Sequence, residues 1–397
     1  MNIMLTQDQK NEVRELTREL IKKPSYSGKE DGVVAVLGEY MKKNGYDDVV
    51  VDKYGSIIGC IKGNRPGPKI LYDGHIDTVP VPDPAVWKRD PFGAEVIDGK
   101  IYGRGASDMK GSVAAMAVAA AMVARETGRN FAGEIYVAGV VHEECFEGVA
   151  AREISKRVNP DIVIIGEASE LNLKIGQRGR AEIVVETFGV PAHSANPEKG
   201  VNAVHSMMRL AAEIEKITPA SQPVLGKGVA VLTDIISTPY PGASVVPSHC
   251  RATYDRRLLV GDTLESVIKP FQEAVKKLEA ADPTFKAKVS YAFGKEHCHT
   301  GNDIEGERFF PGWLFEEKEA FVQDALAGLK GIGQNPTITH YSFCTNASHY
   351  AGEKGIKTLG YGPSRENLAH TIDEYIEESQ LYGATEGFAA ISKALLK

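Results

Sequence analysis

The sequence predicts an α/β fold in which a mixed sheet flanked by helices is interrupted by an inserted ferredoxin-like α+β domain. Helical and strand-like patterns alternate along roughly the first 180 residues, as in sheets covered by helices. Beyond Arg180 the order becomes β-α-β-β-α-β, which is typical of a ferredoxin-like sandwich. The chain has 397 residues, of which 43% are hydrophobic, so it is long enough for two domains. We expect residues 1–179 and 293–397 to form one discontinuous domain and residues 180–292 to form the insert.

The first domain begins with two helices. Residues 6–21 show helical apolar spacing after a candidate N-cap, and residues 31–44 repeat it before Gly45 ends the helix. The expected elements then alternate: strands at 49–51, 57–59 and 70–72, an alanine-rich helix after Gly111, a strand at 134–141, a helix at 149–157 and a strand at 162–165. This alternation favours a sheet that is at least partly parallel.

The insert is expected to contain four strands and two helices. The strands are predicted at 181–188, 229–236, 250–258 and 286–292, and the helices at 201–217 and 264–280. The first domain resumes near Phe293, because a further candidate ligand, His370, lies beyond the insert.

Candidate metal ligands follow three of the expected strands. His75 follows the strand at 70–72, Glu143 follows that at 134–141, and Glu167 follows that at 162–165. In α/β sheets ligands gather at the carboxyl ends of strands, where loops converge on a rigid base. A cap on the following turn is the alternative role for Glu167.

Two further segments add carboxylates. Asp77 lies two residues after His75, where it can fix the orientation of a metal-binding imidazole. Asp108 lies in the glycine-rich turn 103–111 that opens the alanine-rich helix. It is either an ordinary helix cap or a carboxylate that bridges two cations about 3.5–4 Å apart.

Glu143 and Glu144 are adjacent, and two neighbouring acids are not easily both ionised unless a cation neutralises them. We therefore expect Glu144 to bind metal and Glu143 to act as a general base. The pair His142-Glu143 does not belong to an HExxH motif, because position 146 is Phe. His370 lies in an irregular loop before the C-terminal helix, where a solvent-exposed histidine is the alternative.

Composition limits the partners and the location. The net charge of −7 comes from interspersed acids and bases without a basic stripe, so nucleic acid is not an expected partner. The run 113–124 is too short and too rich in alanine to span a membrane. Residues 1–8 lack the features of a signal peptide, which predicts a cytoplasmic protein.

The five cysteines are irregularly spaced, which favours reduced thiols. His297-Cys298-His299 lacks the further ligands that a structural zinc site needs.

Five motifs carry a resemblance to a known family. They are His75-Ile76-Asp77-Thr78, the turn from Gly103 to Gly111, Glu143-Glu144, Gly166-Glu167-Ala168-Ser169 and Ala369-His370-Thr371-Ile372-Asp373-Glu374. In this order they resemble the dinuclear zinc peptidase and deacylase family of acetylornithine deacetylase, succinyl-diaminopimelate desuccinylase and glutamate carboxypeptidase. The implied fold is that of the zinc exopeptidases, with the insert as a lid and dimerisation domain.

The resemblance also implies roles at the metal centre. His75 and Glu167 would hold one Zn²⁺, Glu144 and His370 the other, and Asp108 would bridge them, with Co²⁺ or Mn²⁺ as alternative metals. Glu143 would be the general base, and Asp77 would orient His75.

Other segments resemble the parts of the family that handle substrate. His193, in Gly189-Val190-Pro191-Ala192-His193-Ser194, matches a lid histidine that in dimeric relatives reaches the partner's active site. Arg178, Thr345 and Asn346 lie in segments similar to those that contact substrate, and a structural ion pair is the alternative for Arg178. The segments 176–180, 255–257 and 296–313 are most similar to the selenium-metabolism-linked hydrolases.

We therefore expect a metal-dependent hydrolase that cleaves an amide bond of a small N-acyl amino acid or dipeptide-like substrate with a free carboxylate. A homodimer formed through the lid is also expected. The alternatives are hydrolysis of a carbamoyl (ureido) amino acid and a non-catalytic binding protein on the same scaffold.

Overall fold

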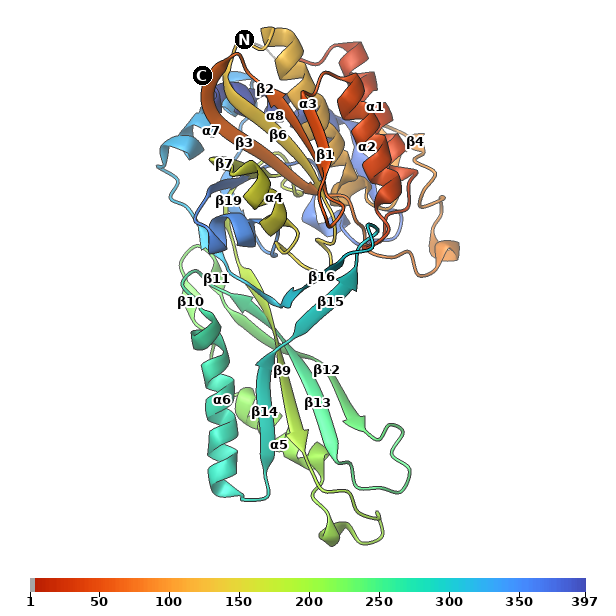
Figure 1. Cartoon of the computed structure of the whole chain (residues 1–397), viewed down its shortest axis with the longest axis vertical. Coiled ribbons are helices and arrows are strands. Elements are labelled where there is room, and N and C mark those ends of the chain that lie inside the picture. Colours follow the sequence, from red (N-terminus) through yellow and green to blue (C-terminus); the bar gives the residue numbers. More distant parts are fainter. Residues whose placement is uncertain (1–3) are drawn as a thin grey trace. The chain divides into compact units, whose positions relative to one another are not determined.

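The computed structural model describes residues 4–397. The prediction that the N-terminus is not a signal peptide concerns residues 1–8, of which residues 1–3 lie outside the described residues. The chain folds into two compact units, both drawn in Figure 1. Unit 1 contains the described part of 1–177 together with Lys295–Glu305 and Trp313–Lys397. Unit 2 contains Arg178–Gly294 and Gly306–Gly312. Residues 306–312 belong to unit 2 because the short strand β17 (Phe309–Phe310) pairs with strand β9 (Gly179–Phe188).

The sheet of unit 1 is mixed, in the order β1-β2-β6-β3-β7-β20-β8-β18, with β19 paired to β8. Its strands are β1 (Asp48–Val51), β2 (Ile57–Lys62), β3 (Arg65–His75), β6 (Ala132–Val140), β7 (Ile162–Ile165), β8 (Leu173–Gln177), β18 (Trp313–Leu314), β19 (Ile338–Tyr341) and β20 (Lys357–Gly360). Strands β6, β3, β7 and β20 run parallel to one another, whereas β1 and β2 pair antiparallel. The predicted mixed α/β sheet is thus confirmed.

The helices of unit 1 lie close to the expected ranges. They are α1 (Gln7–Ile21), α2 (Asp31–Lys43), α3 (Gly111–Thr127) and α4 (Ala151–Val158), and the C-terminal part adds α7 (Ala320–Gly331) and α8 (Glu378–Leu395). Thr6 caps α1, because its side chain accepts a hydrogen bond from the main-chain N–H of Gln9. Helix α3 is buried from Gly111 to Ala124 and packs against α1 and α8. Its small side chains allow this close approach, which explains the alanine-rich sequence.

The three central parallel strands bring the candidate ligands together. Strand β3 lies between β6 and β7, and all four residues of β7 are buried. His75 is the last residue of β3, whereas Glu143 and Glu167 lie in the loops that follow β6 and β7. The three segments therefore meet at one edge of the sheet.

A small sheet that the sequence did not predict joins the C-terminal loop to the turn before α3. Its strands are β4 (Val96–Ile97), β5 (Lys100–Tyr102) and β21 (Tyr375–Glu377), in the order β21-β5-β4. Ile376 is paired with Ile101, and the N–H of Gly103 donates to the carbonyl of Glu374 at 2.8 Å. This pairing brings the loop of His370 beside the turn of Asp108.

Unit 2 has the predicted ferredoxin-like order of elements. Its strands and helices are β9, α5 (Ala203–Ile214), β10 (Ser221–Gln222), β11 (Gly226–Lys227), β12 (Val229–Thr238), β13 (His249–Leu258), α6 (Leu264–Ala281) and β14 (Lys286–Tyr291). The main sheet has the order β12-β13-β9-β14 and is antiparallel. Helices α5 and α6 contact each other and cover a core that includes Ile183, Met207 and Phe271.

A hairpin of β15 (Phe293–His297) and β16 (Asp303–Glu307) follows. Its tip contacts the loop after β1, since the side chains of Thr300 and Asn302 both donate to the carbonyl of Lys53. The five cysteines form no disulfide in the described part of the chain. Among the described residues, no helix combines the length and the apolar character needed to cross a membrane.

Candidate metal centre

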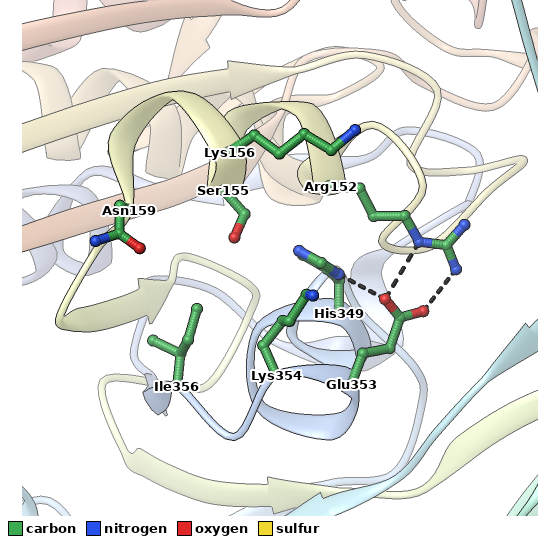
Figure 2. A pocket seen from close by; sticks show the side chains of 8 residues that line it. All are labelled: Arg152, Ser155, Lys156, Asn159, His349, Glu353, Lys354 and Ile356. Carbon is green, nitrogen blue, oxygen red and sulfur yellow. Dashed lines mark hydrogen bonds and ion pairs between the residues drawn. The ribbon is translucent and has the colours of Figure 1, made fainter.

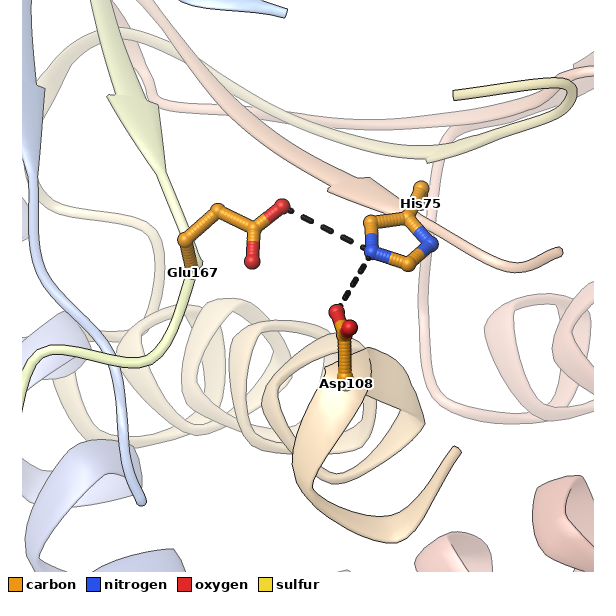
Figure 3. A group of neighbouring side chains, drawn as sticks. All are labelled: His75, Asp108 and Glu167. Atoms are coloured by element: carbon orange, nitrogen blue, oxygen red, sulfur yellow. Dashed lines mark hydrogen bonds and ion pairs between the residues drawn. The ribbon is translucent and has the colours of Figure 1, made fainter. Parts of the chain in front are cut away.

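Five side chains from separate segments of unit 1 form two groups of three that share Asp108. One group is His75, Asp108 and Glu167 (Figure 3), and the other is Asp108, Glu144 and His370; within each group the ligand atoms lie within 4.8 Å of one another. The Nε2 atom of His75 lies 2.9 Å from Asp108 Oδ1, and that of His370 lies 3.1 Å from Asp108 Oδ2. Each oxygen of Asp108 thus faces a different histidine.

The remaining carboxylates complete the two groups. Glu167 Oε1 lies 3.5 Å from His75 Nε2, and Glu144 Oε2 lies 3.2 Å from His370 Nε2. His75 and Glu167 are buried, whereas the side chain of His370 is half exposed. The second group is therefore the more accessible one.

Asp77 orients His75 through its main chain. The His75 Nδ1 atom lies 2.9 Å from the carbonyl oxygen of Asp77 but 3.7 Å from its nearer carboxylate oxygen. A carbonyl can only accept, so Nδ1 carries a hydrogen, and Nε2 is the ring atom that faces the cluster and would bind a metal after losing its own hydrogen. A metal ligand needs this tautomer.

The carboxylate of Asp77 instead holds the loop that carries the adjacent acids. Its Oδ1 accepts the N–H of Glu143 at 3.1 Å, and its Oδ2 accepts the N–H of Glu144 at 3.2 Å. The hydroxyl of Ser27 also donates to Oδ2 at 2.7 Å. Asp77 therefore fixes the main chain from which Glu143 and Glu144 project.

Glu374 holds the turn of Asp108 in the same way. Its Oε1 accepts the N–H groups of Ser107 at 2.8 Å and Asp108 at 3.1 Å. Its Oε2 accepts the N–H of Gly105 at 3.1 Å and Nη1 of Arg104 at 2.6 Å. All these donors converge on one buried carboxylate, so Glu374 ties together the main chain of the turn that carries Asp108.

The charge of the cluster favours a cation. Burial raises the pKa of Glu167 to about 8 and also raises the pKa values of Glu143 and Glu144, and in each case neighbouring carboxylates add to the effect. Among residues 4–397, no ion pair joins these three acids or Asp108 to a lysine or arginine.

The neighbouring carboxylates raise the pKa values of both histidines. Hydrogen bonds to Asp108 and Glu144 raise the pKa of His370 to about 10. Burial opposes the charged form of His75, but the hydrogen bond and charge of Asp108 outweigh it and raise its pKa. The two imidazoles and three carboxylates of the groups are a donor set suited to divalent cations such as zinc, so the residues present fit a dinuclear centre.

Glu143 belongs to neither group of three, although it is buried beside them. His142, the residue before it, has a positive φ of 57°, a conformation that non-glycine residues rarely adopt. This backbone conformation and the hydrogen bonds to Asp77 fix the main chain of the two consecutive acids, of which Glu144 joins a metal-binding group and Glu143 does not.

Thr345 and Asn346, predicted to contact substrate, have buried side chains that bind other parts of unit 1. The hydroxyl of Thr345 donates to Gln177 Oε1 at 2.7 Å. Asn346 donates from Nδ2 to Asp73 at 2.9 Å and accepts the N–H of Gly148 at 2.8 Å. These contacts tie the loop of Asn346 to β3 and to the loop after β6.

Arg178 and His193 lie in unit 2. Arg178 Nη1 donates to the carbonyl of Lys227 at 3.2 Å. His193 is exposed, and its Nδ1 accepts the N–H of Ala195 at 3.0 Å. This hydrogen bond leaves the ring hydrogen on Nε2 in the neutral form, which makes Nε2 a donor.

Several positioning residues were not identified from the sequence. Glu374 and Arg104 lie inside the quoted motifs, close in sequence to the candidate ligands His370 and Asp108. This proximity of an acid and a base to two ligands is the sequence feature that could have identified them. Ser27 and Asp73 carry no such signal, because their contacts are set by the tertiary fold. In the described part of the chain, the His297-Cys298-His299 segment contributes to neither metal-binding group.

Comparisons with known proteins agree with this geometry. The model of peptidase family M20/M25/M40 matches residues 71–394. The uncharacterized protein YgeY of Escherichia coli (strain K12) is 30% identical, over 97% of this chain and 94% of its own. A succinyl-diaminopimelate desuccinylase of Cereibacter sphaeroides is also 30% identical, over 96% of this chain and 97% of its own.

A solved structure shows the same fold. YXEP of Bacillus subtilis, described as a dinuclear metal binding peptidase from the M20 family, has a TM-score of 0.74 at 14% identity and covers 98% of this chain and 99% of its own. The family match spans more than half of the chain and includes all five candidate ligands. The chain belongs to peptidase family M20/M25/M40 and is a metallohydrolase of the peptidase or deacylase type with a candidate His/Asp/Glu metal site.

Proposed function

We propose that this protein hydrolyses an amide bond of a small N-acyl amino acid or dipeptide-like substrate with the help of two divalent cations. The observation that carries the proposal is the pair of three-ligand groups that share Asp108, with Glu143 buried beside them and outside both. This arrangement matches the two roles, ligand and base, that the reaction needs.

His75 and Glu167 would hold one cation, Glu144 and His370 the other, and Asp108 would bridge them. Zinc suits this set of imidazole and carboxylate donors, and Co²⁺ or Mn²⁺ are alternatives. When bound, the two cations supply a nucleophile at neutral pH and polarise the scissile carbonyl. Asp77 and Glu374 would keep the ligand segments in place.

Glu143 would take the proton from the attacking water and return it to the leaving amine. Burial raises its pKa above the ordinary value for a glutamate, and a carboxylate with a raised pKa is a stronger base. His193 would donate from Nε2 to the oxygen of the carbonyl as negative charge develops there. The hydrogen bond that its Nδ1 accepts from Ala195 supports this tautomer.

A free carboxylate on the substrate is expected from the family, and Arg178 offers a forked donor for it. The name of the desuccinylase relative supports an N-acyl substrate. Thr345 and Asn346 remain candidates for substrate contact only if their buried side chains give up hydrogen bonds.

A homodimer through unit 2 is also proposed. Strand β12 is at the edge of its sheet, and its residues Val231, Ile235 and Ile236 are each about half exposed. An edge strand with exposed apolar side chains favours pairing with a second copy. The cytoplasmic location and the relation to selenium-metabolism-linked hydrolases remain predictions from the sequence.

The test is a substrate panel on metal-free and metal-reconstituted protein. N-acetyl and N-succinyl amino acids, dipeptides and ureido acids would be assayed with zinc, cobalt or manganese. Turnover of an N-acyl amino acid or dipeptide only after metal addition supports the proposal, and preference for ureido acids points to the alternative substrate. Metal binding without turnover of any compound would contradict the enzymatic role.

Two sets of variants separate the proposed roles. Glu143→Gln should keep both metals and lose about 10²–10⁴-fold in kcat, whereas Glu279→Gln, on the exposed face of α6, should behave as wild type. For His193, mixing His193→Ala with His75→Ala subunits tests action across the dimer. Activity above that of either variant alone supports it, and no recovery argues against it.

A further inference from the structure

A pocket of about 470 Å³ lies between helix α4 and the helical turn η4 (Ser348–Glu353) of unit 1. Figure 2 shows the side chains that line it, which are Arg152, Ser155, Lys156, Asn159, His349, Glu353, Lys354 and Ile356. None of these residues is a proposed metal ligand. The pocket is therefore separate from the candidate metal centre.

One face of α4 forms the first wall. Arg152, Ser155 and Lys156 have the spacing i, i+3 and i+4, which places them on one side of the helix, and Asn159 lies just past its end as the left-handed C-cap. All four side chains can donate hydrogen bonds. This wall is suited to a ligand rich in acceptors.

The charges of the lining are predominantly positive. Glu353, the one acid among the lining residues, is paired with Arg152 at 2.5 Å and with His349 Nδ1 at 2.6 Å. Lys156 has only a 3.7 Å contact with Glu153, and the described residues provide no ion pair for Lys354. Two lysine charges are left without a close counter-charge in the lining.

His349 contributes a buried polar atom without a partner. The residue is 2% exposed, and its Nε2 makes no hydrogen bond in the described part of the chain. Glu353 accepts from Nδ1, so Nδ1 carries a hydrogen. In Figure 2 the other ring nitrogen points away from Glu353, toward the side of Ser155. A ligand group placed there would meet a buried ring nitrogen that has no partner in the described part of the chain.

The two walls are fixed with respect to each other. The hydroxyl of Ser348 donates to the carbonyl of Glu147 at 3.4 Å, and Asn346 accepts from Gly148 at 2.8 Å. A Cβ atom on Gly148 would lie 2.8 Å from Ser348 Oγ, so the segments are in close contact. The pocket is thus formed before a ligand arrives.

We propose that this pocket binds a small oxyanion, through a phosphate or carboxylate group held by Lys156 and Lys354 beside the unpaired Nε2 of His349. Lysine ammonium groups donate charge-assisted hydrogen bonds to such groups. Ile356 supplies an apolar patch for the remainder of the ligand. The proposal is independent of the proposed reaction.

The test is calorimetric titration of the metal-loaded, full-length protein with pyrophosphate or citrate at constant ionic strength. The double variant Lys156→Ala/Lys354→Ala should weaken binding at least about tenfold. The matched control Lys42→Ala/Lys276→Ala removes the same charge from exposed positions elsewhere and should bind as wild type. Binding of pyrophosphate alone would identify a phosphate site, and binding of citrate alone a carboxylate site.

Binding at the metals gives the opposite pattern. It would be lost on metal removal and unaffected by the double variant, and this result would overturn the proposal. The absence of saturable binding by either probe up to about 10 mM would also overturn it. Binding that survives metal removal and is weakened by the double variant supports it.

Discussion

The side-chain carboxylate of Glu374 accepts the main-chain N–H of Asp108 at 3.1 Å. Glu374 lies four residues after His370, so one loop carries a candidate ligand and also fixes the turn of the shared carboxylate. The contact links the two metal-binding groups through the main chain as well as through the side chain of Asp108.

The first prediction concerns this contact. Glu374→Gln replaces one carboxylate oxygen with a donor, which would face an N–H group of the turn. We expect metal affinity to fall about 10- to 100-fold, as for other residues that orient ligands. Competition with a chelator measures it, and Glu377→Gln, whose side chain binds Arg365, is the control. Unchanged affinity would contradict the role of Glu374.

The second prediction concerns Asp77. Its two oxygens accept from Glu143 and Glu144, and Asp77→Asn can accept only one of these N–H groups. The general base would then be less well placed, and we expect kcat to fall about 10- to 100-fold. Metal content and kcat would be measured together, with Asp83→Asn as a control. A normal kcat would show that this carboxylate does not position the base.

The third prediction separates a structural from a substrate-binding role for Asn346. Asn346→Ala leaves the N–H of Gly148 and an oxygen of Asp73 without their partner. We expect the free energy of unfolding to fall by about 2–4 kcal/mol. Urea denaturation measures this, with the exposed Asn196→Ala as a control. Normal stability together with a raised KM would instead indicate contact with substrate.

The fourth prediction concerns acid stability. Although burial alone would raise it, the pKa of Glu353 is lowered to about 2 by His349 and Arg152. A folded pKa below the ordinary 4.5 means that the contribution to stability is complete above pH 4.5 and is lost as the pH falls toward 2. Because the group is partly exposed, we expect only about 1 kcal/mol. The difference in unfolding free energy between wild type and Glu353→Gln should therefore shrink over this range. A difference that does not depend on pH would contradict the assignment.

The fifth prediction concerns metal removal. A ligand that binds only the folded state stabilises it, and here it would also neutralise the acids Glu144 and Glu167. We expect chelation to lower Tm and zinc to restore it. Glu167→Gln should reduce this response, measured by calorimetry at fixed protein concentration. Equal Tm values with and without metal would contradict a metal centre in this cluster.

Much of the fold follows from the sequence because its signals are local. The apolar run of β7, the cap at Thr6 and the glycine-rich turn at Asp108 each leave a short pattern. The small sheet of β4, β5 and β21 leaves none, since its strands are two or three residues long and form only by pairing.

The candidate site divides in the same way. The sequence predicts the candidate ligands from residue type and strand position, both of which are visible in a short segment. It does not reveal that Asp77 orients His75 through a carbonyl or that Asp73 binds Asn346, because both contacts depend on tertiary geometry.

Glu144 and His370, the acid and the histidine that complete the accessible group, are 226 residues apart in the chain. During synthesis the segment of His370 emerges after the whole of unit 2. A nascent chain that has completed β3, β6 and β7 therefore has only part of the donor set. Metal capture would then be a late event in biogenesis, and a chain that is cut short before His370 would leave the ribosome with Glu144 unable to complete its group.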